Sequence, residues 1–223
     1  MSLIKKNILS IIDELKQNNS QHKSDVRLVA VSKGQGQEKI LEALESGHNI
    51  FGENYLQEAI DKQKSLTDYK IEWHFIGPIQ SNKCKLIAEN FSWVQSVDRI
   101  KVANKLNDSL KDRASINVCI QVNISNEETK SGLKINEINS LAKHINGLDK
   151  LTLRGLMAIP SNTIDNEILK NEYIQLKFIY KNLKKEYSSI DTLSMGMSND
   201  YLLAIENGSN LVRIGSKIFG KRT

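Results

Sequence analysis

The stretch Val29-Ala30-Val31-Ser32-Lys33 is an apolar run that ends in a hydroxyl group and a cation. Its length and its valines predict a buried strand with Lys33 at the carboxyl end. Near the other end of the chain, Leu211-Val212-Arg213-Ile214 predicts another such strand, followed at once by Gly215 and Ser216. If the strands of this chain are parallel and form a closed barrel, the first and the last strand are neighbours. Lys33 and Gly215 would then face the same pocket.

Strand-like and helix-like patterns alternate along the whole chain. The predicted strands cover residues 27–32, 49–52, 72–76, 92–95, 116–123, 151–156, 191–194 and 211–214. The predicted helices cover residues 3–17, 37–46, 55–66, 80–89, 98–112, 135–146, 166–186 and 199–207. Such alternation with short connections favours parallel strands joined by right-handed crossovers, and eight units of this kind close into a barrel.

We therefore predict an α/β fold, a single (β/α)8 barrel of the TIM type with an extra N-terminal helix. We expect one domain over residues 1–223 and no second domain. An open, doubly wound sheet is the alternative. No G-x-G-x-x-G follows the first strand, and the lone Gly34-Gln35-Gly36 is a weak signal for dinucleotide binding.

Composition narrows the function classes. The chain of 223 residues is 39% hydrophobic and 26% charged, which is ordinary for a globular domain. The formal charge is +5, but the lysines are scattered among glutamates, and this pattern does not indicate a nucleic-acid surface. No apolar run is long enough to predict a membrane span or a secretory peptide. Cys84 and Cys119 lack metal-ligand spacing, so we expect reduced thiols and a cytoplasmic protein.

Lys33 is the strongest candidate for chemistry. The active face of a barrel lies at the carboxyl ends of its strands, where Lys33 follows a wholly apolar strand. A partly desolvated amine beside another cation has a lowered pKa and can form a Schiff base with a carbonyl group. The alternative is a surface lysine whose stem packs on the barrel while its charge reaches water.

The loops after the last two predicted strands suggest a phosphate site. Ser198 is placed to cap the helix predicted at 199–207, and amides at a helix start attract anions. Gly196 and Gly215 would let the backbone approach a phosphate closely. The alternative is that Ser198 only caps the helix and that the glycines only form turns.

Two further polar residues lie within predicted strands. Arg213 alternates with two apolar residues and should point into the barrel, where it needs acceptors. It could pair with Glu53 or another acid, or donate to a ring nitrogen. His74 is either a core histidine or a residue of the pocket. We expect no metal site and no Gly-x-Ser-x-Gly nucleophile.

These motifs together resemble those of the pyridoxal phosphate homeostasis proteins, in order over nearly the whole chain. The matching segments are Ala30-Val31-Ser32-Lys33, Phe51-Gly52-Glu53-Asn54-Tyr55-Leu56-Gln57-Glu58, Trp73-His74-Phe75-Ile76-Gly77 with Gln80, Asn82 and Lys83, Gln121-Val122-Asn123 with Lys130-Ser131-Gly132, Gly155-Leu156-Met157 with Ile159-Pro160, residues 194–200, and Val212-Arg213-Ile214-Gly215 with Ile218-Phe219-Gly220.

The resemblance implies a barrel related to the N-terminal domain of alanine racemase, which is fold type III of the enzymes that use pyridoxal 5′-phosphate (PLP). It implies PLP held as a Schiff base on Lys33, with Arg213 at the pyridine nitrogen. The cofactor-binding residues implied are Lys33, Asn54, His74, Met195, Ser198, Arg213, Gly215 and Ser216. Of these, Ser198 and the backbone of Gly215 and Ser216 would hold the phosphate, Asn54 would lie beside the cofactor, and His74 and Met195 would line its pocket. The segment Gly34-Gln35-Gly36 departs from the family's bulkier stretch, and we expect a more flexible loop there.

The same resemblance implies a non-catalytic carrier. An arginine at the ring nitrogen disfavours the protonated ring that most PLP enzymes use as an electron sink, although it does not forbid weak chemistry. We expect no second domain after the eighth strand of the kind that supplies the other base of a racemase. We therefore expect a monomer that buffers PLP or delivers it to apoenzymes. The alternatives are a weak amino-acid racemase or decarboxylase, and a Schiff-base aldolase acting on a sugar phosphate.

Overall fold

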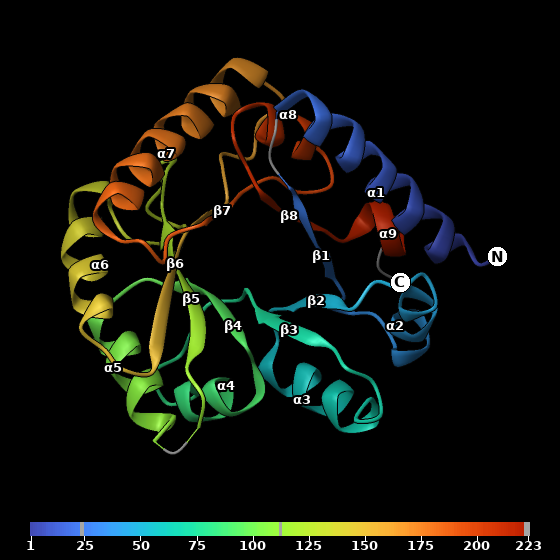
Figure 1. The fold of residues 1–223 in the computed structure, drawn as a ribbon, viewed down its shortest axis with the longest axis horizontal. Helices are drawn as coiled ribbons and strands as arrows, with labels where there is room; N and C mark the ends of the chain where they lie inside the picture. Colours follow the sequence, from blue (N-terminus) through green and yellow to red (C-terminus); the bar gives the residue numbers. More distant parts are fainter. Residues whose placement is uncertain (23–24, 112, 221–223) are drawn as a thin grey trace.

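The protein forms a closed barrel of parallel strands. The structure, a computed structural model, describes residues 1–22, 25–111 and 113–220. Within these residues, eight strands pair in the order β1 to β8, and β8 pairs with β1 (Figure 1). They are β1 (Arg27–Val31), β2 (Ile50–Glu53), β3 (Glu72–Phe75), β4 (Trp93–Val97), β5 (Ile116–Val122), β6 (Leu151–Ala158), β7 (Thr192–Ser194) and β8 (Leu211–Ile214). The predicted (β/α)8 barrel is confirmed.

Helices surround the barrel, and the extra N-terminal helix is present. They are α1 (Leu3–His22), α2 (Gln37–Leu44), α3 (Leu56–Ser65), α4 (Cys84–Asn90), α5 (Ile100–Ser109), the 3-10 turn η1 (Ile135–Glu137), α6 (Ile138–Asn146), α7 (Asn166–Glu186), α8 (Tyr201–Glu206) and α9 (Ser216–Phe219). Helix α1 packs against α2, α8 and α9, so the first and the last helix lie on the same side of the barrel (Figure 1).

Several helix boundaries differ from the sequence prediction. Helix α4 begins at Cys84 rather than at residue 80, because residues 80–83 form a turn in which the Lys83 amide donates to the Gln80 carbonyl. The short helix α9, directly after β8, was not predicted. Four residues are too few to show a helical period.

The main hydrophobic core lies between the strands and the helices. One face of α7 is buried there, and its members are Leu169, Tyr173, Leu176, Tyr180 and Leu183. Burying a large apolar side chain of this kind contributes about 1.5–3 kcal/mol. A second, small cluster of Trp93, Cys119 and Met157 lies apart from this core.

Strand register decides which side chains point into the barrel. Neighbouring partners in parallel strands point the same way, and successive residues alternate between the two faces. Val29 pairs with Arg213, Val31 with Gly52, and Gly52 with His74, so these residues share the inner face. By the same alternation, Ser32 and Glu53 lie on the outer face, toward the helices.

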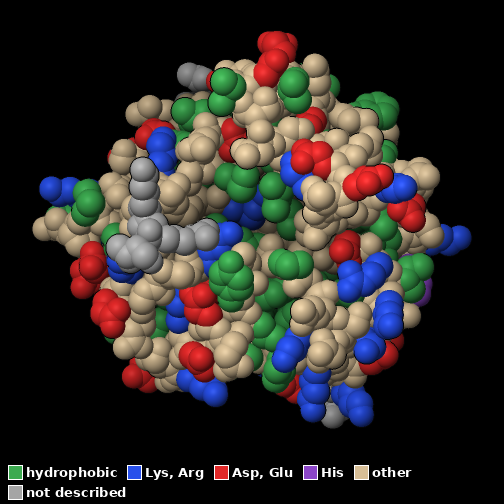
Figure 2. All heavy atoms as spheres, turned by 180° about the vertical axis from the view of Figure 1, so that it is seen from behind, with side chains coloured by type: hydrophobic (Ala, Val, Ile, Leu, Met, Phe, Trp, Pro, Cys, Tyr) green, Lys and Arg blue, Asp and Glu red, His purple; other side chains and the backbone are tan. Residues whose placement is uncertain are grey.

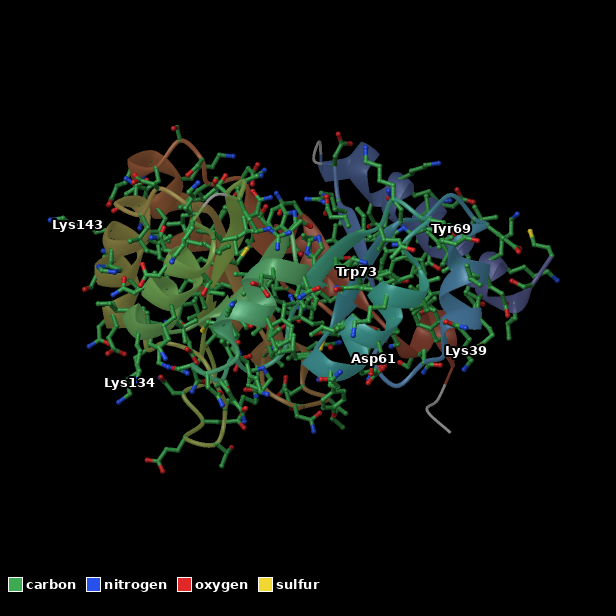
Figure 3. The ribbon with its side chains drawn as sticks, turned by 90° about the horizontal axis from the view of Figure 1, so that it is seen from below. Lys39, Asp61, Tyr69, Trp73, Lys134 and Lys143 are labelled. Atoms are coloured by element: carbon green, nitrogen blue, oxygen red, sulfur yellow. The ribbon has the colours of Figure 1, made fainter. Side chains whose placement is uncertain are left out.

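The carboxyl ends of the strands open onto a hollowed face. Figure 3 shows Lys39 of α2 and Lys134 before η1, both of which follow strand ends, on one side of the barrel, with Tyr69, before β3, on the other. Figure 2 shows a face with a central hollow, with Lys or Arg side chains at depth and hydrophobic side chains at the rim.

In the described parts of the chain, no helix is both long and apolar enough to cross a membrane.

Candidate functional site

Lys33 lies on a hydrogen-bonded turn at the end of β1. The Ser32 amide extends the strand pairing by donating to the Gly52 carbonyl at 3.0 Å, and the Gln35 amide closes the turn by donating to the Ser32 carbonyl at 3.0 Å. Gly34 is the third residue of this turn and has a φ of 69°, a conformation that glycine adopts without strain. The turn leaves Lys33 half-buried. Gly34 therefore lies within a hydrogen-bonded turn, and Gly36 follows it as the N-cap residue of α2.

The end of β8 lies directly beside the end of β1. Ala30 pairs with Ile214, and a Cβ on Gly215 would stand 3.2 Å from the Val31 carbonyl oxygen. This close approach leaves little room for a side chain at position 215. The fold thus brings the turn of Lys33 next to the first turn of α9, as the sequence predicted for the first and last strands.

Ser198 joins this region from the loop after β7. Its Oγ accepts hydrogen bonds from the Gly215 amide at 3.3 Å and from the Lys217 amide at 3.5 Å. Ser198 is half-buried and Ser216 is exposed. The predicted group of Ser198, Gly215 and Ser216 therefore comes together at one place, where backbone amides and a hydroxyl group offer hydrogen-bond partners for an anion.

The predicted role of Ser198 as a helix cap is wrong. Helix α8 begins at Tyr201, and its N-cap residue is Asp200. The Asp200 carboxylate accepts from the Met197 amide at 2.7 Å and from the Tyr173 hydroxyl, so it fixes the loop before the helix. A Cβ on Gly196, whose φ is 92°, would stand 2.6 Å from the Cβ of Ala204. Gly196 thus serves the packing of α8 against the barrel.

Arg213 is buried inside the barrel and bonds to neutral acceptors. Its Nη1 donates to Ser194 Oγ at 2.5 Å and its Nη2 to the Ala158 carbonyl at 2.8 Å. Burial lowers the pKa of Arg213 to about 10, so the side chain stays charged at neutral pH. The ion pair with Glu53 that the sequence left open is wrong, because Glu53 lies on the outer face and binds Lys62.

A chain of buried hydrogen bonds continues from Arg213 across the barrel. Ser194 Oγ donates to Gln95 Oε1 at 2.6 Å, Gln95 Nε2 lies 2.7 Å from His74 Nδ1, and His74 Nε2 lies 2.7 Å from Glu72 Oε1. Arginine can only donate and a carboxylate can only accept, so every hydrogen bond of the chain runs from Arg213 toward Glu72. The chain fixes the orientation of each group and leaves Ser194 as an acceptor for Arg213.

His74 and Met195, which we expect to line the cofactor pocket, are both buried. His74 is fully buried, and its ring stacks on Trp93 with ring centroids 5.1 Å apart. It accepts a hydrogen bond at Nδ1 and donates from Nε2, which makes it a neutral imidazole. Met195 is fully buried in the main core. His74 is linked to Arg213 through Gln95 and Ser194.

Asn54 carries an unsatisfied atom. It follows Glu53 at the end of β2, and by alternation it shares the inner face with Gly52. Its Oδ1 is buried and has no hydrogen-bond partner within the described residues. Buried amide oxygens in native proteins are nearly always paired. Such an atom at the carboxyl end of β2 fits a residue whose partner is a ligand. Within the described chain, no group of His, Cys, Asp and Glu has the geometry of a metal site.

We expect acid to destabilise the fold through His74. Burial lowers the pKa of His74 from its ordinary value of 6.5. Below pH 6.5 the unfolded chain therefore binds a proton that the folded chain does not, so the free energy of unfolding falls as the pH falls and is constant above that range. The slope for one histidine is at most about 1.4 kcal/mol per pH unit.

Urea denaturation between pH 5 and pH 8 measures this slope. His74→Gln should reduce it, although the variant is less stable at every pH because it interrupts the buried chain. His48 is a matched site, since burial lowers its pKa as well, and His48→Gln should remove only its own share. An unchanged slope in the His74→Gln variant would contradict the assignment.

Comparisons with known proteins agree with this fold and show the family. Residues 8–223 match the family described as "Alanine racemase, N-terminal domain". The chain is 46% identical over 230 residues to the "Pyridoxal phosphate homeostasis protein" of Vibrio alginolyticus, with 100% of this chain and 99% of the relative covered. It is similar to PipY of Synechococcus elongatus without PLP (TM-score 0.89, 32% identity) and with PLP bound (TM-score 0.87, 31% identity). Each of these two matches covers 97% of this chain and 100% of PipY.

Proposed function

This chain belongs to the pyridoxal phosphate homeostasis protein family, and we propose that it binds PLP reversibly as a Schiff base on Lys33 and buffers or delivers it. The observation that carries the proposal is the placement of the Lys33 turn beside Ser198 and Gly215. An amine and an anion site then share one opening, as a phosphorylated aldehyde requires. The likeness to PipY, which has been solved with PLP bound, supports the same ligand class.

The residues of the opening have distinct roles in this proposal. The Lys33 amine adds to the aldehyde carbon and a water molecule leaves, so the bond forms without an oxidant or a reductant. The Ser198 hydroxyl and the backbone amides at Gly215 and Ser216 hold the phosphate. Asn54 supplies the unpaired Oδ1 as a hydrogen-bond acceptor.

Arg213 argues for a carrier. PLP supplies an aldehyde and an electron-withdrawing ring, and the ring withdraws electrons best when its nitrogen is protonated. Arg213 remains a cation and is held as a donor through Ser194 and Ala158, so it cannot provide that proton. His74 is fully buried and both of its ring nitrogens are hydrogen-bonded within the protein, so it is not placed to serve as a base for a bound amino acid.

Several further features of the proposal follow from the family and the composition. We propose a cytoplasmic monomer that gives PLP to apoenzymes. Both cysteines, Cys84 and Cys119, are buried and unpaired, as is usual in a reducing compartment. The alternative function is a weak PLP-dependent racemase or decarboxylase.

A transfer experiment tests the carrier role. The protein is loaded with PLP, freed of unbound PLP by gel filtration and mixed with an apo-aminotransferase. We expect aminotransferase activity to recover up to the amount of PLP that was bound. In parallel, the loaded protein alone should leave the chirality and the concentration of added alanine unchanged. Turnover of alanine at rates typical of dedicated enzymes, about 1 per second or more, would establish the enzymatic alternative.

A further inference from the structure

Three charged side chains meet behind Lys33, on the outer face of the barrel. Lys62 of α3 donates to Glu53 Oε1 at 2.7 Å and to Glu58 Oε1 at 2.5 Å. The Lys62 side chain is 8% exposed, that of Glu53 is fully buried, and that of Glu58 is 30% exposed. The group is therefore wedged between α3 and the ends of β1 and β2.

This group forms hydrogen bonds with the backbone on both sides of Lys33. On the side before Lys33, the Lys62 amine donates to the Ser32 carbonyl at 2.7 Å. On the side after it, the Gly34 amide donates to Glu58 Oε1 at 2.6 Å. The first and the third residue of the turn are thus both bonded to α3, and Lys33 is the residue between them.

We propose that Glu58 and Lys62 are positioning residues that hold the Lys33 turn so that its amine is presented to PLP. The inference rests on the proposed function and adds to it. Both residues act through the backbone of Ser32 and Gly34. They therefore affect the rate at which the Lys33 amine reacts with the aldehyde.

The spacing and the chemistry of the group fit this role better than a role in stability. Glu58 and Lys62 are four residues apart on α3, so their side chains lie on one face of the helix. A buried ion pair loses much of its Coulombic gain to desolvation, and it is weak evidence for stability. Burial raises the pKa of Glu53, and its Oε2 lacks a partner within the described residues, which marks a group that is costly to keep. What such a group provides is a fixed geometry.

The test measures the rate at which the visible Schiff-base band appears after PLP is mixed with each variant in a stopped-flow instrument. Glu58→Ala removes the acceptor of the Gly34 amide, and Glu58 is exposed enough for the variant to fold. We expect band formation to slow about tenfold to a hundredfold, because small misplacements of a reacting group have effects of this size. Asp61→Ala is the matched control. It removes an exposed carboxylate of the same helix, labelled in Figure 3, that accepts a hydrogen bond from Gln57.

Two further readouts separate positioning from folding. Glu58→Gln keeps an oxygen that can accept from the Gly34 amide, so it should restore the rate to within about threefold of wild type. Amide hydrogen exchange should be faster at Gly34 in Glu58→Ala than in wild type, with the exchange of the barrel strands unchanged. Lys62→Arg is the conservative variant of the second positioning residue. It should also retain most of the rate of band formation.

The outcomes distinguish this inference from the proposed function. If wild type forms the band and Glu58→Ala forms it at the wild-type rate, the inference is overturned and the proposed function stands. If Asp61→Ala is slowed as much as Glu58→Ala, the effect is general to α3 and the inference is again overturned. If wild type forms no band at all, the proposed function is overturned, and the inference that rests on it is overturned as well.

Discussion

Replacing Lys33 by alanine is expected to abolish the visible absorption band that the wild-type protein develops with PLP. The band requires an imine, and the proposed imine nitrogen is Lys33 Nζ. Borohydride reduces an imine to a stable secondary amine, so it should fix one PLP per wild-type chain and none on Lys33→Ala. Residual binding through the phosphate site alone should be weaker by about 100-fold or more, and a 100-fold loss corresponds to about 3 kcal/mol.

The control for Lys33→Ala is a nearby lysine with another role. Lys39 lies on α2, and its Nζ donates to Gln35 Oε1, so it is next to the turn without lying on it. Lys39→Ala should keep both the band and the borohydride adduct. Peptide mapping of the reduced wild-type protein should find the modification within the segment that contains Lys33. A band that persists in Lys33→Ala would assign the Schiff base to another amine and would sink the proposed site.

The order of strands and helices could be predicted because each element carries its own local pattern. Apolar runs such as Val29-Ala30-Val31 are strands in any barrel of this kind, and eight of them in alternation leave few topologies. The end of a helix is less local. Ser198 and Asp200 are both residue types that often cap helices, and here their side chains bind Tyr173 and the first turn of α9 instead, contacts that the local sequence does not reveal.

The candidate site could be predicted only where strand ends reveal it. Lys33 and Gly215 lie at the carboxyl ends of the first and last strands, so topology alone brings them together. Gln95 and Ser194 are 99 residues apart and meet only inside the closed barrel. Each is a polar residue that points into the barrel from its strand. This orientation can be inferred only after the pairing register of the strands is known. The buried position of Lys62 could not be predicted, because a lysine on a helix is usually a surface residue.

Replacing Gly155 by alanine is expected to destabilise the fold by more than about 4 kcal/mol, one of the largest effects a single methyl group can have. Gly155 pairs with Thr192 of β7 and has a φ of 150°, and a Cβ would stand 1.8 Å from the Thr192 carbonyl oxygen. Both strands belong to the closed ring, so neither can move aside without breaking pairs on its other edge. A domain of this kind is stable by about 5–15 kcal/mol in total.

Gly155→Ala combines a steric clash with Thr192 and the backbone strain of a positive φ. The variant Gly47→Ala separates these two causes. Gly47 has a φ of 84°, and a Cβ added there would meet no described atom within 4 Å, so alanine at this position causes backbone strain without a clash. We expect a cost of about 1–2 kcal/mol for Gly47→Ala, measured from urea denaturation. Gly155→Ala should lose most of its soluble, cooperatively folding protein in the same assay. If the two variants were equally stable, β6 and β7 would have room to separate, and the barrel would be less tightly closed than its strand pairing indicates.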